Sequence, residues 1–193
     1  MRGREREWHA VQRLLERRGS GILLVEGEPG VGKSWLLSEA ADAARADGFA
    51  VIAEGADELT RCMPLGPLLL GLKKPPATLS EEPAHLRPGL QMSLVDSVRV
   101  RLEQRAHVGP VLICLDDLQW ADAVTLLALR LLPWQLASSR EVLVAALIVL
   151  AALRWDEGLM AESLDLCREA VLLAGEIPPD ARLAQARLAL ASN

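Results

Sequence analysis

The residues with the most specific chemical pattern are Gly27–Ser34, which read GEPGVGKS and match G-x-x-x-x-G-K-[ST] in full. The glycines let successive backbone N–H groups turn toward an anion, and a following helix adds its positive N-terminal end. Lys33 can reach the β- and γ-phosphates, and the Ser34 hydroxyl can ligate Mg²⁺. The pattern predicts that ATP or ADP, with Mg²⁺, is bound by Gly27, Glu28, Pro29, Gly30, Val31, Gly32, Lys33 and Ser34. A glycine-rich turn without a ligand is the alternative, and it leaves the Lys33–Ser34 pair unexplained.

Two adjacent carboxylates form the second candidate site. Asp116 and Asp117 directly follow the apolar run Val111–Leu115. The carboxyl end of a parallel strand is where open α/β sheets bind ligands. In a chain with a phosphate-binding loop, Asp116 is expected to hold Mg²⁺ and Asp117 to orient or deprotonate the attacking water. Side chains alternate along a strand, so the two acids need not share one role. Acids in a solvated loop are the alternative.

The elements that must position these residues alternate between strands and helices. Apolar runs predict strands over 22–26, 49–53 and 111–115. Helical periodicity occupies 4–18, 34–46, 94–107 and 121–136, with a short helix over 65–72. This alternation predicts an α/β fold of the P-loop NTPase kind, with a parallel sheet flanked by helices.

The C-terminal residues follow a different pattern, so we divide the chain into an ATPase core, 1–147, and a helical tail, 148–193. Helical patterns cover 153–174 and 180–191, separated by Ile177-Pro178-Pro179. The pair resembles one degenerate tetratricopeptide-like repeat. A single repeat cannot bury both of its faces, so we expect the tail to contact a protein partner or a second copy of the chain.

Composition narrows the possible partners and the compartment. A net charge of −5 over 193 residues argues against general nucleic-acid binding, and no helix-turn-helix pattern follows Ala145, so we expect no direct DNA binding. The apolar run Val142–Leu153 is shorter than the ~20 residues that span a bilayer. Three isolated cysteines and a charged N-terminus without an apolar signal segment predict a cytoplasmic protein with reduced thiols.

Three motifs in order carry a family resemblance: GRERE at Gly3–Glu7, GEPGVGKS, and LDDLQWAD at Leu115–Asp122. Over residues 2–145 the chain resembles the signal-transduction ATPases with numerous domains. It is most similar to the ATPase module of large ATP-binding LuxR-family transcriptional regulators, and the Orc1-like or AAA-type ATPase domain is the same kind of module. The resemblance implies a nucleotide-driven switch, with Gly3, Arg4 and Glu5 beside the adenine. Family members are several times longer and often end in a DNA-binding helix-turn-helix.

The sequence departs from that family after its third strand. The expected fourth strand, Val142–Leu147, runs into further apolar residues without a polar residue or a turn, and the first cation beyond it is Arg154. We interpret this as a missing intervening segment; one continuous buried helix over 141–153 is the alternative. The family's γ-phosphate sensor is therefore unidentified, and we expect slow ATP hydrolysis or none.

Two other functions stay open at this point. The chain can be a helical interaction fragment in which the nucleotide is structural. It can also be a small-molecule kinase, since such enzymes share the loop, but the only candidate for an arginine-rich lid, Arg99–Arg105, has the spacing of a helix face.

Overall fold

The computed structural model describes residues 5–17, 21–27, 29–73, 86–138, 147–154 and 184–190. Its strands form one five-stranded sheet in the order β2-β3-β4-β1-β5, and every neighbouring pair is parallel. The strands are β1 (Gly21–Gly27), β2 (Ala50–Gly55), β3 (Val111–Asp116), β4 (Leu147–Arg154) and β5 (Ala184–Leu190). The helices are α1 (Glu5–Arg17), α2 (Lys33–Ala46), α3 (Gly66–Gly71), α4 (Pro88–Ala106) and α5 (Ala123–Ser138), with short 3-10 turns η1 (Thr60–Cys62) and η3 (Leu118–Trp120).

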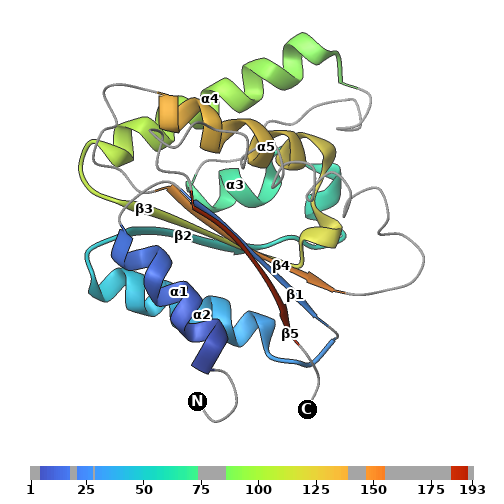
Figure 1. Cartoon of the computed structure of the whole chain (residues 1–193). Coiled ribbons are helices and arrows are strands. Elements are labelled where there is room, and N and C mark those ends of the chain that lie inside the picture. Colours follow the sequence, from blue (N-terminus) through green and yellow to red (C-terminus); the bar gives the residue numbers. More distant parts are fainter. Residues whose placement is uncertain are drawn as a thin grey trace.

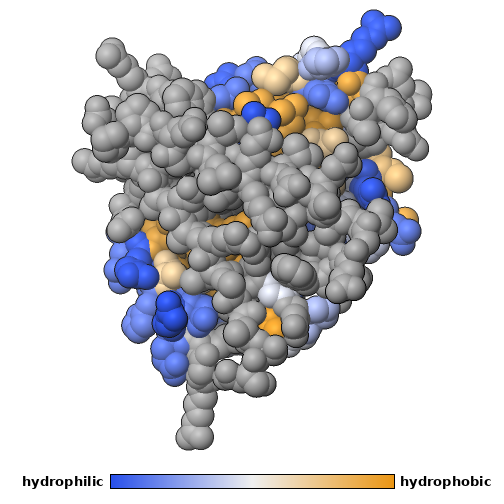
Figure 2. Space-filling model, turned by 45° about the vertical axis from the view of Figure 1, so that its right-hand side comes forward, coloured by the Kyte–Doolittle hydropathy of each residue, from blue (hydrophilic) through white to orange (hydrophobic). Residues whose placement is uncertain are grey.

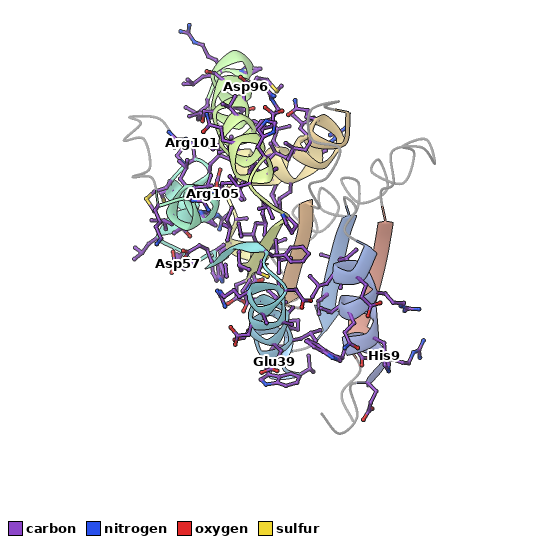
Figure 3. All side chains as sticks on the ribbon, turned by 90° about the vertical axis from the view of Figure 1, so that its left-hand side faces the viewer. His9, Glu39, Asp57, Asp96, Arg101 and Arg105 are labelled. Carbon is purple, nitrogen blue, oxygen red and sulfur yellow. The ribbon has the colours of Figure 1, made fainter. Side chains whose placement is uncertain are left out.

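Helices cover both faces of the sheet: α1 and α2 lie on one side, and α3, α4 and α5 on the other (Figure 1). Figure 3 shows the same layers from another side, with His9 of α1 and Glu39 of α2 across the sheet from Arg101 of α4. Alternate strand residues feed two apolar clusters. In β3, Ile113 packs with α3, α4 and α5, whereas Cys114 packs with α1 and α2. This two-sided burial explains why the strands read as uninterrupted apolar runs.

The strand order places the first and third strands on either side of the fourth. β4 lies between β1 and β3, and β5 lies on the far side of β1. In register, Gly27 at the end of β1 pairs with Arg154 at the end of β4. Parallel strands bring their carboxyl ends to one edge, so the loops after β1 and β3 both emerge there. The predicted P-loop NTPase-like α/β fold is confirmed.

Most predicted elements of the core agree with the structure to within a few residues. β1, β2, β3, α1, α2 and α5 all occur where the pattern indicated them. α4 begins earlier than predicted, at Pro88, because proline fits the first helical position, where its missing N–H has no partner to lose.

A strand runs over Leu147–Arg154, so it continues beyond the predicted end at Leu147, and the alternative of a continuous helix is wrong from Leu147 onward. Residues 141–146 lie outside the described residues. The segment is apolar throughout, so hydropathy alone could not locate its ends; pairing with β1 and β3 does so.

The predicted helical tail is also corrected in part. Ala184–Leu190 is a strand paired with β1, where we expected a helix over 180–191. Alanine, leucine, glutamine and arginine all favour helices, but tertiary context often overrides this intrinsic preference, and here the strand forms ladder hydrogen bonds with β1. Leu153 and Arg154 end β4, and the rest of the other expected helix, 155–174, lies outside the described residues. The sheet thus takes strands from both sides of the expected boundary at residue 147, and that division stays a prediction.

α4 is the longest described helix, and its outer face is mixed. Arg99 pairs with Asp96 at 2.8 Å and with Glu103 at 2.5 Å, while Leu90, Met92 and Val100 are exposed. Figure 2 shows apolar surface among hydrophilic side chains in the upper part of the view, the level at which α4 lies in Figure 1. Among the described helices, none has the length and apolarity needed to cross a membrane.

Candidate functional site

The loop between β1 and α2 leaves a helix N-terminus without a side-chain cap. Gly30 and Gly32 have φ of 81° and 90°, a backbone conformation that glycine adopts without strain. Gly32 is the N-cap of α2; among the described residues the helix has no side-chain capping hydrogen bond, and its first turn contains no acidic residue. The first N–H groups of a helix have no partner within it, so they suit an anion's oxygens.

Lys33 joins the two ends of this loop. Its side chain is buried, and Nζ donates a hydrogen bond of 2.8 Å to the carbonyl oxygen of Gly27. A buried ammonium is costly unless hydrogen-bonded acceptors or anions surround it. Ser34 follows at the exposed start of the helix. The lysine ammonium and the serine hydroxyl thus come from adjacent residues at the N-terminus of α2, which has no side-chain cap.

Asp116 lies on the side of the sheet that α2 covers. It ends β3, and strand alternation gives it the face of Leu112 and Cys114. That face meets α2, because the Cys114 thiol lies 4.0 Å from the carbonyl oxygen of Leu37. Asp116 is half-buried, so its carboxylate remains accessible. Asp116, the acid predicted to hold the metal, therefore lies at the carboxyl end of its strand and on the face of the sheet that α2 covers. Lys33 and Ser34 begin α2 on that same face.

At Asp117 the backbone turns away from the direction of β3. Its φ of 52° is left-handed, and its N–H donates to Oδ1 of Asp116 at 2.8 Å. Gln119 Nε2 donates to Oδ1 of Asp117 at 2.8 Å. The two acids are therefore held differently, one at the strand end and the other in the turn that follows.

One strand separates the two halves of the site. β1 and β3 both pair with β4, so with neighbouring strands about 4.8 Å apart their ends stand roughly 10 Å apart. The end of β4 between them is Arg154. The phosphates and metal of a nucleotide could span this distance across the end of β4.

The donors present fit Mg²⁺ accompanied by a phosphate. A hydroxyl and a carboxylate are the oxygen ligands that Mg²⁺ prefers, and the ion usually takes its remaining ligands from water and substrate phosphates. No group of three or more His, Cys, Asp or Glu side chains in the described part of the chain could hold a metal ion. Ser34 and Asp116 would therefore hold the ion together with the nucleotide.

The other predicted site residues are only partly placed. Glu28, Gly3 and Arg4 lie outside the described residues. Glu5 is the first residue of α1 and is exposed. α1 packs through Val11, Leu14 and Leu15 into the cluster that includes α2. The role of Gly3, Arg4 and Glu5 beside the adenine stays a prediction.

Sequence reasoning gave no role to Asp122, which the structure buries. Its Oδ1 accepts backbone N–H groups of Leu65, Val124 and Thr125 at 3.2, 2.9 and 3.0 Å, and its Oδ2 accepts the Thr125 hydroxyl. Burial raises the pKa of this carboxyl, while the hydrogen bonds act in the opposite direction. An acid one residue before a helix that starts at Ala123 is an N-cap signal that could have drawn attention to it.

Fold and loop together define a P-loop NTPase-like protein. Residues 1–145 match the model of the AAA ATPase domain family, so the chain belongs to this family. No curated protein matches the sequence.

Two solved structures share the fold. AMPPCP-bound DnaA from Aquifex aeolicus matches with a TM-score of 0.51 and 20% identity, over 96% of this chain and 47% of that chain. A DNA replication initiation factor matches with a TM-score of 0.50 and 18% identity, over 96% of this chain and 46% of that chain. This chain therefore spans less than half the length of either protein.

Proposed function

We propose that this chain is an ATP-binding switch module, with Mg²⁺, of a LuxR-type transcriptional regulator, and that it hydrolyses ATP slowly or not at all. The observation that carries the proposal is the uncapped N-terminus of α2 with the buried Lys33 beside it, at the same sheet edge as Asp116. Membership in the AAA ATPase family and the likeness to DnaA, which was solved with AMPPCP, support nucleotide binding.

In this proposal, each half of the site has a distinct task. N–H groups of residues 27–34 and the Lys33 ammonium bind the phosphates, and Ser34 and Asp116 hold Mg²⁺. The ion supplies charge neutralisation on the phosphate oxygens when it is bound. Asp117 orients or deprotonates the attacking water, while Gly3, Arg4 and Glu5 lie near the base.

Arg154 supplies a candidate for the γ-phosphate sensor. It ends the strand between β1 and β3, and its backbone pairs with Gly27 at the start of the loop. A cation that contacts the γ-phosphate would favour ATP over ADP. We expect slow turnover from this chain by itself. In related reactions an arginine supplied by a partner protein can contribute about 10³–10⁵-fold to the rate of hydrolysis.

Nucleotide binding and hydrolysis are tested separately. A thermal-shift series with Mg²⁺-ATP and Mg²⁺-ADP is expected to raise the melting temperature, since ligand at 100 times Kd stabilises by ~2.7 kcal/mol. No shift with either nucleotide would contradict the binding proposal. Single-turnover hydrolysis that is fast would contradict the slow switch and leave the binding proposal intact.

The regulatory role needs its own tests. We expect no retention of DNA at physiological salt in a mobility-shift assay. We also expect the C-terminal residues to mediate contact with a protein partner or with a second copy. If sedimentation shows association and the chemical cross-links across that contact all fall outside residues 155–193, the contact lies elsewhere.

A further inference from the structure

One buried carboxylate connects the loop after β2 with the loop after β3. Both loops follow the carboxyl ends of their strands, where the nucleotide is proposed to bind. Asp122 is 3% exposed and caps α5 by accepting the N–H groups of Val124 and Thr125. The same Oδ1 also accepts the N–H of Leu65, which is 57 residues away in the sequence. A cap of α5 needs only the first two bonds, so the third one requires another explanation.

A second tie joins the same two loops at their other ends. The N–H of Ala56, directly after β2, donates to the carbonyl oxygen of Asp116 at 3.0 Å. Residues 56–65 are therefore fastened to residues 116–122 both at the start and at the end. Each loop limits how far the other can move.

The loop after β2 is itself compact. The N–H of Asp57 donates to the Thr60 hydroxyl at 2.7 Å, and the N–H of Thr60 donates to the Asp57 carboxylate at 2.6 Å. Gly66 fits closely behind this turn, since a Cβ there would lie 3.1 Å from the carbonyl oxygen of Thr60. The loop over residues 56–65 is thus restrained both by its own hydrogen bonds and by those to residues 116–122.

Both loops hold a non-glycine residue in left-handed backbone conformation. Leu65 has φ of 60° and is fully buried, and Asp117 has φ of 52°. Such conformations persist only where the surroundings over-determine them, and they cluster at functional sites. Asp122 hydrogen-bonds to the first of these residues and lies at the end of the segment that contains the second.

We propose that Asp122 is a positioning residue for the metal: its bond to Leu65 fixes the segment 116–122, so that Asp116 is held in place for Mg²⁺ before the nucleotide arrives. This inference rests on the proposed function of Asp116. Outer residues that orient metal ligands typically contribute 10–100-fold to metal affinity. Asp122 acts through the backbone of the segment and does not touch the ion.

The test separates this positioning role from helix capping. In Asp122→Ser, the hydroxyl still caps α5, but the shorter side chain cannot also bond to Leu65. In Asp122→Asn, the side-chain oxygen accepts the same N–H groups and the amide donates to the Thr125 hydroxyl. Val98→Ala, in the buried face of α4, is a matched control that destabilises the core and leaves the hydrogen-bonding groups of Asp122 and Leu65 unchanged.

Calorimetry gives the dissociation constant of ATP with Mg²⁺ and with chelator, and the ratio of the two is the metal-dependent gain. We expect Asp122→Ser to lower this gain by about 10-fold or more, and Asp122→Asn and Val98→Ala to keep it within about threefold of wild type. Both constants come from the same variant, so a general loss of stability does not change the ratio. An unchanged gain in Asp122→Ser overturns the inference, as does a lost gain in Val98→Ala. If the wild-type chain binds no ATP in either condition, the proposed function itself fails.

Discussion

The Nζ atom of Lys33 lies 2.8 Å from the carbonyl oxygen of Gly27, so a buried ammonium joins the two ends of the loop that is expected to bind the phosphates. Burying a cation is unfavourable, and such residues are usually kept for function and not for stability. We therefore expect Lys33→Met, without nucleotide, to change the free energy of unfolding by less than about 1 kcal/mol or to raise it. Urea denaturation measures this change. A loss above about 2 kcal/mol would mean that Lys33 serves mainly the fold.

Changing Asp116 or Asp117 to asparagine is expected to affect two different properties: the metal-dependent gain in ATP affinity and the rate of hydrolysis. Asn at position 116 can still accept the N–H of residue 117, but it loses the charge that holds Mg²⁺, so the metal-dependent gain in ATP affinity should fall at least ~10-fold. Asp117→Asn should keep that gain and lower single-turnover hydrolysis by at least ~10². Equal effects of the two variants on both measurements would contradict the separate roles.

Arg154 is expected to decide between ATP and ADP. As the proposed γ-phosphate sensor, Arg154 gives a clear expectation: Arg154→Ala should lower the affinity for ATP by about 10-fold and leave that for ADP within about twofold. Arg101→Ala, on the exposed side of α4, is the matched control. Competition titrations of both nucleotides provide the measurement, and a parallel loss of ATP and ADP affinity would remove Arg154 from the sensor role.

Cys114 is expected to be unreactive in the folded protein and to make stability depend on alkaline pH. Burial raises the pKa of its thiol to about 12, whereas Cys62 is exposed. In a Cys167→Ser background, a thiol reagent should therefore label Cys62 and spare Cys114 until the chain unfolds.

The sign of the pH effect follows from proton binding. Between the ordinary thiol value and about 12, the unfolded chain has lost this proton and the folded chain retains it, so the free energy of unfolding falls as pH rises. The slope attributed to this thiol is about 1.4 kcal/mol per pH unit. Cys114→Ala should lack that part of the slope; identical pH profiles for variant and wild type would show that the thiol is accessible to solvent.

The sequence predicted those parts of the fold whose local pattern and tertiary role agree. The run Ile22–Val25 is apolar because both faces of β1 are covered, and the glycines after it allow the left-handed turns at Gly30 and Gly32. The end of the fourth strand was predicted too early because Val142–Leu153 has no internal boundary; pairing with β1 extends the strand to Arg154.

A candidate site could be proposed from the sequence where the residue types alone specify chemistry, and its roles stay predictions. The lysine and serine of the loop and the carboxylate of Asp116 fall into this group. The tie from Asp122 to Leu65 was not predictable, because it joins residues far apart in the chain and depends on a left-handed leucine that no local rule indicates. β5 was missed for a similar reason: its residues favour a helix by themselves, and pairing with β1 makes them a strand.

The most direct test of the account is calorimetric titration of ATP with Mg²⁺ into the wild-type chain, Lys33→Met and the exposed-lysine control Lys73→Met. The account predicts one binding site in the wild type and in Lys73→Met, and a loss of at least about 10-fold in affinity in Lys33→Met. Equal affinities in all three proteins, or no binding to the wild type, would contradict it.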